Sequence, residues 1–559
     1  METKDFNSND DEAVSTNWSE EFPLTDEVDS TNWSEEFPLT DEVGSAERRK
    51  LYLAALNGDW KSVKDMLNIQ RKITNKGETT LHIAAAANQE EFVKNLVNRL
   101  SRENLTAENN VGNTALTYAA AAGNVKIAKV MLEKNPDLPN LGSGVKPLFM
   151  AASLGHSQMV QFLYYETKEI VSGWDENEQA KLFITCVESD LYGLALEMLN
   201  ANPYFATARN TDGDTALHLL ARNPSAFVSE SRSRLKLKQE NSKQSQANEL
   251  FEKCLQAYRG DVENPSVIPH VLFDAAEAGN IECLIMLIRF DLDLLWKTRN
   301  SKSIFHVAVE KRHESMFNLL NEIGSVGDII INTKIEDTGN ILHLAAGLAP
   351  KEKLNAVSGA ALQMQREMLW FKEVEKVVPP AFKQMKNGNE ETPYALFART
   401  HEELRTKGEK WMMDTTKYSM VVATLISFIM LTAAKADGLK DSPNLFMVFS
   451  VSSAMALFCS LTSLVMFLSI LTSRYSYNDF LVCLPVRLMI GVASLFISIA
   501  AMTVSFSASF WSDRELPLIF VVSGSFACVP ILCVLLKYRL FVDIVRSIFF
   551  RFRKRRRLL

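Results

Sequence analysis

The stretch that decides the fold is Gly77-Glu-Thr-Thr-Leu-His-Ile-Ala-Ala, residues 77–85. It recurs as Gly112-Asn-Thr-Ala-Leu-Thr-Tyr-Ala-Ala and as Gly213-Asp-Thr-Ala-Leu-His-Leu-Leu-Ala, and a shorter copy reads Gly339-Asn-Ile-Leu-His-Leu-Ala-Ala. Weaker copies begin at Lys146 and Ser303. One unit of this size cannot bury its apolar face alone, so the repetition predicts a stack of units that share a continuous core.

Aligning the copies on the apolar residue of the motif gives nine anchor residues: Leu51, Leu81, Leu116, Leu148, Phe183, Leu217, Leu272, Phe305 and Leu342. Consecutive anchors are 30 to 37 residues apart, except for one step of 55. A period near 33 with this chemistry is the signature of the ankyrin repeat. We therefore expect an all-α fold with an ankyrin-repeat solenoid of about nine copies over residues 46–350.

Each copy contains the elements of two helices. A Thr or Ser before the first helix can cap it, and paired alanines such as Ala84/Ala85 allow close helix packing. Gly123, Gly155 and Gly279 stand between the two helices, where a positive φ is needed. The histidines at the repeated position (His82, His218, His306 and His343) are expected to form buried hydrogen bonds in the turn. Metal ligation is disfavoured because these residues lie on successive repeats.

The 55-residue step contains a polar insertion over residues 223–265, including SESRSRLKLKQENSKQSQAN. Its composition predicts a mobile loop between the sixth and seventh repeats. The Ser-Arg run is either an ordinary solvated loop or a phosphorylation site.

Four long apolar stretches follow the repeats: 418–434, 445–471, 488–510 and 516–536, none with Asp, Glu, Lys or Arg. About 20 apolar residues in a helix cross a bilayer core of ~30 Å, so a multi-pass region over residues 412–536 is expected. Frequent Ser and Thr in these spans indicate either helix packing or, alternatively, a polar pore lining in an oligomer.

The charge is polarised along the chain. Residues 1–45 carry fourteen acidic groups against Lys4 and contain the string STNWSEEFPLTDEV twice, at 15–28 and 30–43, so a disordered tail is expected. The copies are either an accidental duplication or two docking motifs. Residues 537–559 form a basic tail, and we expect contact with the membrane surface from Arg551, Arg553, Lys554, Arg555, Arg556 and Arg557. The alternatives for this tail are a simple determinant of topology and a nuclear or endoplasmic-reticulum sorting signal. This basic bias predicts that both termini are cytosolic.

Residues 351–411 are expected to form a capping helix and a linker, with an apolar face from Leu362 to Val374. Together with Glu391-Thr-Pro-Tyr-Ala-Leu-Phe, Gly408-Glu-Lys-Trp-Met-Met-Asp-Thr and VVATLI from Val421, this region closely resembles plant ankyrin-repeat membrane proteins with a PGG domain. The resemblance implies about four C-terminal spans, a role in immune or stress signalling and, most often, the plasma membrane. The namesake Pro-Gly-Gly is not retained, since Ala434-Lys-Ala-Asp-Gly-Leu-Lys occupies its place.

No catalytic, cofactor-binding or metal-binding constellation is found in the sequence. The Asp-His-His-Cys segment of palmitoyltransferases is missing, as are a phosphate loop and zinc-ligand spacing. We therefore expect a non-enzymatic scaffold that binds a cytosolic or membrane protein through the concave face of its repeats, contacts lipid, does not bind nucleic acid and can form a homo-oligomer. The alternative is an ion channel or channel subunit with a regulatory ankyrin module. One sequence does not single out the protein-binding residues.

Overall fold

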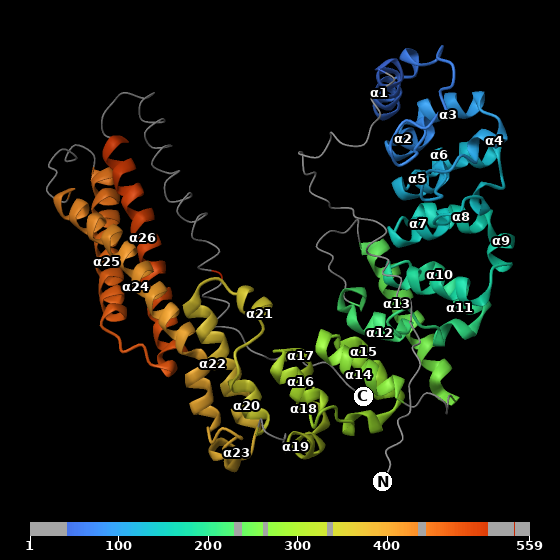
Figure 1. Ribbon diagram of the computed structural model, residues 1–559. Helices are drawn as coiled ribbons and strands as arrows, with labels where there is room; N and C mark the ends of the chain where they lie inside the picture. The colour runs from blue at the N-terminus through green and yellow to red at the C-terminus, as the bar shows by residue number, and fades with distance from the viewer. Residues whose placement is uncertain are drawn as a thin grey trace, which may run out of the picture. The chain divides into compact units, whose positions relative to one another are not determined.

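The structure is a computed structural model that describes residues 42–227, 237–260, 266–332, 339–433, 443–511 and residue 542. Contacts divide the chain into two compact units, 1–168 and 169–559. The described residues are helical apart from turns and four isolated β-bridges. This confirms the expectation of an all-α fold (Figure 1).

The first unit consists of helix pairs. Helix α1 (Glu42–Asn57) is followed by the pairs α2 (Thr80–Ala86) and α3 (Glu90–Arg99), α5 (Ala115–Ala122) and α6 (Val125–Lys134), and α7 (Pro147–Ser153) and α8 (Ser157–Glu166). A single turn, α4 (Arg102–Leu105), lies between the first two of these pairs. The first helices pack in the order α1, α2, α5, α7, and α3 packs on α6 in a second row.

The second unit continues the same arrangement after the short α9 (Lys168–Ser172). Its first helices are α10 (Glu176–Glu188), α12 (Ala216–Arg222), α14 (Val267–Ala278), α16 (Ile304–Glu310) and α20 (Ile341–Ala346). The second helices are α11 (Tyr192–Ala201), α13 (Leu237–Ala257), α15 (Ile281–Phe290) and α17 (Glu314–Phe317), followed by α18 (Leu320–Ile323) and α19 (Ser325–Ile331). Neighbouring first helices again pack on one another from α10 to α20.

The repeat chemistry of the sequence is confirmed in detail. All nine anchor residues lie buried on first helices, and the linker residues Gly123, Gly155 and Gly279 have φ of 70°, 70° and 77°. The expected histidine bonds are present: His82 Nδ1 accepts from the backbone N–H of Thr79 at 3.2 Å, while its Nε2 lies 3.0 Å from the carbonyl of Asn113 in the next repeat. The histidine thus closes the cap of its own helix and links two repeats.

The expectation of a mobile loop across residues 223–265 is wrong for residues 237–257, which form α13. Its polar residues hide an apolar row whose members are all buried, namely Ala247, Leu250, Phe251, Cys254 and Leu255. This helix packs on α11 and α12 and takes the place of the second helix of its pair. The insertion therefore lies inside the sixth repeat rather than after it.

The chain then forms α21 (Lys351–Asn355), α22 (Ala360–Val377), α23 (Pro380–Gln384), α24 (Pro393–Ala433), α25 (Pro443–Leu471) and α26 (Cys483–Trp511). Helix α22 packs on α20 and α24, as expected of a capping helix. By length and apolar composition, α24, α25 and α26 are each able to cross a membrane. The described residues therefore supply three such helices; the expected fourth span, 516–536, lies outside them.

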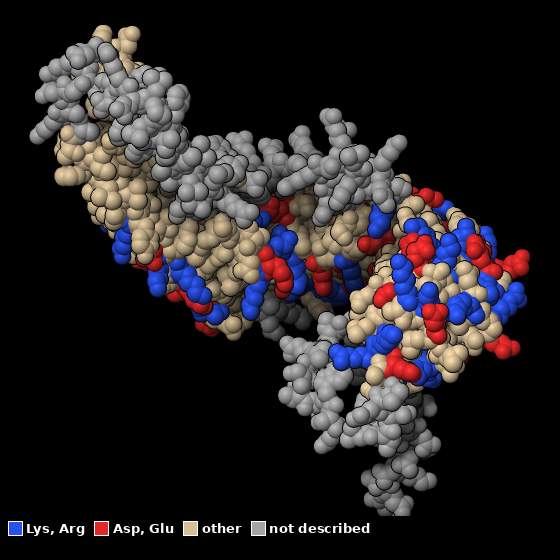
Figure 2. Space-filling model, turned by 90° about the horizontal axis from the view of Figure 1, so that it is seen from above, with Lys and Arg blue, Asp and Glu red and all other residues tan. Residues whose placement is uncertain are grey.

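Helices α24, α25 and α26 pack side by side as a bundle (Figure 1). Its visible surface is almost free of charged side chains, whereas charges of both signs cover the helix pairs (Figure 2). Large apolar side chains such as Phe428 and Phe458 are exposed on this surface. Such a continuous apolar exterior suits contact with lipid rather than water.

Candidate functional site

The end of the solenoid is held by a charged residue at a position that glycine occupies in three other repeats. Arg312 follows α16 in the linker to α17 and has a φ of 60°, like the linker glycines of other repeats. A non-glycine residue rarely adopts this conformation, so the surrounding structure must stabilise it. The Arg312 guanidinium does so by donating to four carbonyl oxygens, those of Val309, Glu310, Ala345 and Gly347.

The same guanidinium forms a buried ion pair with Glu367 on α22. Arg312 Nη2 lies 2.8 Å from Glu367 Oε2, and Nε lies 3.3 Å from Oε1. Glu367 also accepts from the backbone N–H of Ala349 at 3.1 Å, and His401 Nε2 on α24 lies 3.2 Å from its carboxylate. The side chains of Arg312, Glu367 and His401 are 7%, 4% and 0% exposed, respectively. One carboxylate thus connects the last repeats, α22 and α24.

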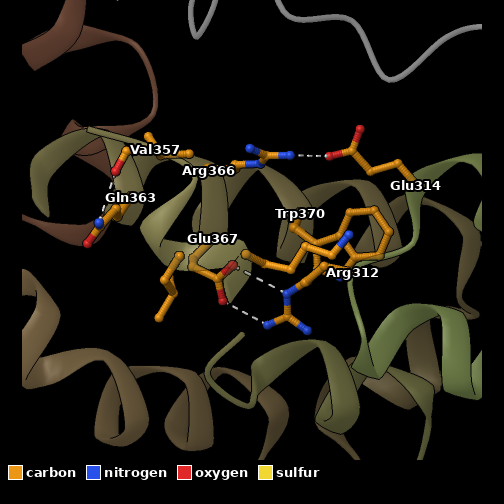
Figure 3. A pocket seen from close by; sticks show the side chains of 9 residues that line it. Arg312, Glu314, Val357, Gln363, Arg366, Glu367 and Trp370 are labelled. Atoms are coloured by element: carbon orange, nitrogen blue, oxygen red, sulfur yellow. Dashed lines mark hydrogen bonds and ion pairs between the residues drawn. The ribbon is translucent and has the colours of Figure 1, made fainter. Parts of the chain in front are cut away.

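Electrostatics of the site favour the ionised pair. Burial alone would raise the pKa of the Glu367 carboxyl, but the Arg312 charge and the hydrogen bond from His401 outweigh it and hold the pKa below its ordinary value. Nearby, burial raises the pKa of Glu314, although its ion pair with Arg366 at 3.0 Å opposes the shift. The cavity between these groups measures ≈ 10 Å³, room for one water (Figure 3).

Aromatic side chains surround the ion pair. Trp370 of α22 donates its indole N–H to the carbonyl of Val309 and packs on Phe317 with ring centroids 5.3 Å apart. On the other side, the Phe397 ring stacks on His401 at 3.9 Å. The charges are therefore enclosed by apolar groups, which is the environment in which breaking such a pair is most destabilising.

A tenth repeat loop, missed in the sequence, precedes α24. In the loop before α5, the Asn109 side chain accepts from the backbone N–H groups of residues 111 and 113, and residue 112 has positive φ. Residues 387–391 repeat this pattern: Asn387 Oδ1 accepts from Asn389 and Glu391 N–H at 3.0 and 2.9 Å, and Glu390 has a φ of 59°.

The histidine of the last recognised repeat bonds to this loop as His82 bonds to the loop of the next repeat. His343 Nε2 lies 3.1 Å from the carbonyl of Glu391, the same position in the loop that Asn113 holds opposite His82. Thr392 then caps the helix that begins at Pro393, and this helix packs on α20. Helix α24 therefore starts as the first helix of a tenth unit and continues into the apolar bundle.

One face of α24 remains buried along its length. The buried positions recur every three or four residues, apart from one step of seven between Thr416 and Ala423: Phe397, His401, Leu404, Gly408, Met412, Thr416, Ala423, Ile426 and Met430. At Gly408 a Cβ would lie 3.3 Å from Ala361 of α22 and from the Phe480 ring, so glycine permits this close crossing. A helix of 41 residues spans about 60 Å, long enough to link solenoid and membrane without a flexible joint.

The place where the last repeats, α22 and the first half of α24 meet is the junction between the solenoid and the bundle. The loop between α25 and α26 also bonds to this junction. Gln365 of α22 donates to the carbonyl of Leu481 at 2.7 Å, and the Tyr477 hydroxyl donates to the carbonyl of Ala398 at 3.0 Å. Tyr477 also bonds to Glu402 of α24. The bundle is thus attached to the capping helix through two of its parts, α24 and this loop.

Hydroxyl groups inside the bundle bond from helix to helix. The Oγ atoms of Ser453 and Ser505 lie 2.5 Å apart. The Ser463 hydroxyl donates to the carbonyl of Gly491 at 2.9 Å, and the Ser498 hydroxyl donates to the carbonyl of Ala456 at 2.8 Å. These bonds satisfy the hydroxyls between α25 and α26. They support the packing interpretation of the span serines rather than a pore lining.

Ion pairs connect neighbouring first helices of the second unit. Arg222 at the end of α12 pairs with Asp274 of α14 at 2.7 Å and also with Asp214. Arg299 pairs with Glu277 and lies 3.8 Å from Asp274. This row of alternating charges is suited to contacts with a polar partner.

A family model of ankyrin repeats matches this chain in three copies, over residues 51–140 and 100–173. Residues 51–173 are ankyrin repeats. Proteins built from ankyrin repeats generally use them to bind other proteins, and the later helix pairs continue the same spacing and cap chemistry. A resemblance to the PGG family remains a prediction.

The predicted membrane-contact residues, Arg551, Arg553, Lys554, Arg555, Arg556 and Arg557, lie outside the described residues, as do both copies of STNWSEEFPLTDEV except for Glu42 and Val43, which begin α1. Among the described residues, no group of three or more His, Cys, Asp or Glu is placed to hold a metal ion. Sequence reasoning missed Arg312, Glu367 and His401, although a charged residue at the linker glycine position was a visible signal.

Proposed function

We propose that this protein is a non-enzymatic, multi-pass membrane protein whose ankyrin repeats bind another protein and hold it at the membrane surface. The observation that carries the proposal is the continuity of α24. Its first turns pack on α20 as a repeat helix, and its last turns pack on α25 in an apolar bundle. A protein bound to the repeats is then held close to the bilayer.

The buried Arg312–Glu367–His401 network supports this role because it makes the connection between the solenoid and the apolar bundle rigid. A flexible linker would let the repeats rotate freely over the bilayer. A helix shared by both parts, fixed by a buried ion pair and by the 472–482 loop, keeps them oriented. Orientation is useful to a scaffold because it determines which partners can meet on the membrane.

The resemblance to plant PGG-domain proteins adds finer expectations. It favours defence or stress signalling, residence in the plasma membrane and cytosolic termini. The partner is then a cytosolic protein or the cytosolic part of another membrane protein. The basic tail at 551–557 would add attraction to anionic lipid.

The loops before the first helices are the best candidate binding surface. They project from the stacked helices, and loop tips carry recognition in repeat proteins. Val111, at the tip of the loop closed by the Glu108–Thr114 bridge, is 60% exposed, which is unusual for an unshielded valine. Tyr165 on α8 is equally exposed but lies on a second helix.

The test uses the full chain reconstituted in nanodiscs as bait for a cell extract, with Val111→Glu compared with Tyr165→Glu. We expect a partner that is retained by wild type and Tyr165→Glu and lost with Val111→Glu. Retention of the same partners by an empty nanodisc would contradict the proposal. Ion flux through liposomes containing the purified protein tests the channel alternative: a conductance abolished by substitutions in α25 or α26 would overturn the pure scaffold.

A further inference from the structure

A cleft at the solenoid-side end of α25 and α26 is not used by the junction. It has a volume of ≈ 390 Å³ and is lined by Ser469, Thr472, Ser473, Arg474, Asp479, Cys483, Leu484 and Arg487. Because the loop that forms it is bonded to α22 and α24, the cleft lies where the apolar bundle meets the charged part of the protein. In an inserted bundle this is the depth of the lipid headgroups.

The cleft presents cationic donors that are only partly used. Arg487 Nη1 donates to the Ser469 carbonyl at 3.2 Å and to Ser473 Oγ at 2.9 Å, which caps the end of α25, while its Nε and Nη2 have no partner among the described residues. Arg474 is exposed and likewise has no hydrogen-bond or ion-pair partner among the described residues. Asp479 is the one acidic residue of the lining and accepts from the Ser476 N–H. The lining therefore carries an excess of positive charge.

An exposed apolar row leads along α25 to this cleft. Phe458, Leu461, Val465 and Leu468 recur at helical spacing and are 72%, 49%, 62% and 57% exposed. Thr472 continues the same face one turn later and enters the cleft lining. A ligand with an anionic head and apolar chains would satisfy both features at once.

From these features we infer that the cleft binds the phosphate headgroup of an anionic glycerophospholipid whose acyl chains lie along the exposed row of α25. Arg474 and the free nitrogen atoms of Arg487 donate to phosphate oxygens, since guanidinium groups match them in bidentate geometry. The hydroxyls of Thr472 and Ser473 already donate to the carbonyls of Leu468 and Ser469, at 3.0 and 2.7 Å, so the two arginines are the donors offered to the phosphate. This inference rests on the proposed insertion of α25 and α26 in a membrane.

The test is native mass spectrometry of the full chain in uncharged detergent, with phosphatidylglycerol and phosphatidylcholine of matched chains. We expect wild type to prefer phosphatidylglycerol and Arg474→Gln to weaken that binding about fivefold, with phosphatidylcholine unaffected. Adding Arg487→Lys, which keeps the charge but loses bidentate geometry, should weaken it further. Lys410→Gln, an exposed cation on α24, is the matched control and should leave the affinity unchanged.

Equal binding of the two lipids by wild type, or an unchanged affinity in Arg474→Gln, would overturn the inference. Displacement of phosphatidylglycerol by an equal concentration of glycerol 3-phosphate would also overturn it, because the occupant would then be a soluble phosphate. Liposome flotation of the same proteins separates the two claims. Wild type that floats without lipid selectivity contradicts only the lipid site, whereas wild type that does not float contradicts the proposed function.

Discussion

The junction and the bundle both hold helices together, but the junction uses charged side chains and the bundle uses neutral ones. At the junction, the last repeats are fastened to α22 by a buried charge pair, Arg312–Glu367, and α24 is joined to it through His401. In the bundle, α25 and α26 are fastened by neutral hydroxyls such as Ser453 and Ser505. Both sets lie buried, but only the junction contains ionised groups.

The difference follows from what lies outside each part. A buried pair next to water can be assembled while its groups are still hydrated, and its geometry then selects one arrangement. Charged groups within a bilayer carry a large cost, so a membrane bundle uses small residues and hydroxyls instead. The change from one chemistry to the other along α24 therefore supports the proposal that the apolar half of this helix lies in a membrane.

The largest effect is expected from breaking the junction pair. Glu367→Leu leaves Arg312 buried without its counter-charge and should lower the free energy of unfolding of the second unit by about 3–5 kcal/mol. The measurement is thermal or denaturant unfolding of the full chain in micelles, with hydrogen exchange over α16–α22 to localise the loss.

The matched control removes both charges. Arg312→Gly with Glu367→Leu restores the residue that other linkers use at positive φ and leaves no buried ion. This double variant should recover most of the lost stability. If Glu367→Leu alone were as stable as wild type, the ion pair would not be what holds the junction.

The next effect is expected in the bundle, from packing rather than charge. A Cβ on Gly491 would lie 2.7 Å from the Phe467 ring, so Gly491→Leu should destabilise the α25–α26 contact by about 1–3 kcal/mol. Ile490→Leu, one residue away on the exposed face, should be neutral. Resistance of the helices to unfolding in sodium dodecyl sulfate reports the difference; equal effects of the two variants would contradict the packing.

The stability of the repeats should depend on pH, whereas that of the bundle should not. Burial lowers the pKa of His82, His218 and His343, so below their ordinary pKa, about 6.5, the unfolded chain binds protons that the folded chain resists. Repeat stability should therefore fall as pH drops through 6.5, by about 1.4 kcal/mol for each unit of pKa shift. Hydrogen exchange at pH 7.5 and 5.5 measures this.

The bundle provides the internal control for that experiment because its spans contain no ionisable histidine or carboxylate in residues 445–471 and 488–510. Its exchange, corrected for the intrinsic pH dependence, should stay constant. His82→Gln should reduce the pH response of the first unit alone. A uniform pH response in both regions would contradict the assignment.

The smallest effect is expected from the serine contact. Ser453→Ala and Ser505→Ala should each cost about 0.6 kcal/mol, because hydroxyl bonds between membrane helices are weak. A double-mutant cycle measured by unfolding in micelles gives the coupling. A coupling as large as that of Arg312 and Glu367 would remove the contrast between the two regions.

Much of the solenoid could be predicted from sequence because each repeat determines its own local structure. The nine anchors, the capping histidines and the linker glycines follow from residue type and spacing alone. Helix α13 could not be foreseen in the same way, since its apolar row is short and lies among polar residues. Only packing against α11 reveals that this row is buried.

The junction was harder to foresee because its residues break the rules that make repeats recognisable. Glu367 is a charged residue on the buried face of α22, and its partner Arg312 lies 55 positions away in sequence. The tenth loop was hidden because Glu390 stands where the earlier loops have glycine. Asn387 followed by Thr392-Pro393 was the remaining signal, and it resembles Asn109 followed by Thr114.

The central claim, that α24 passes from the repeats into the membrane, is tested most directly by cysteine accessibility in proteoliposomes. Thr406→Cys, Phe428→Cys and Phe458→Cys are placed one at a time in a chain whose Cys459, Cys483, Cys528 and Cys533 are replaced by Ala. A membrane-impermeant maleimide should label residue 406 at once and residues 428 and 458 only after detergent is added. Labelling of residue 428 as fast as residue 406 in intact liposomes would contradict the account.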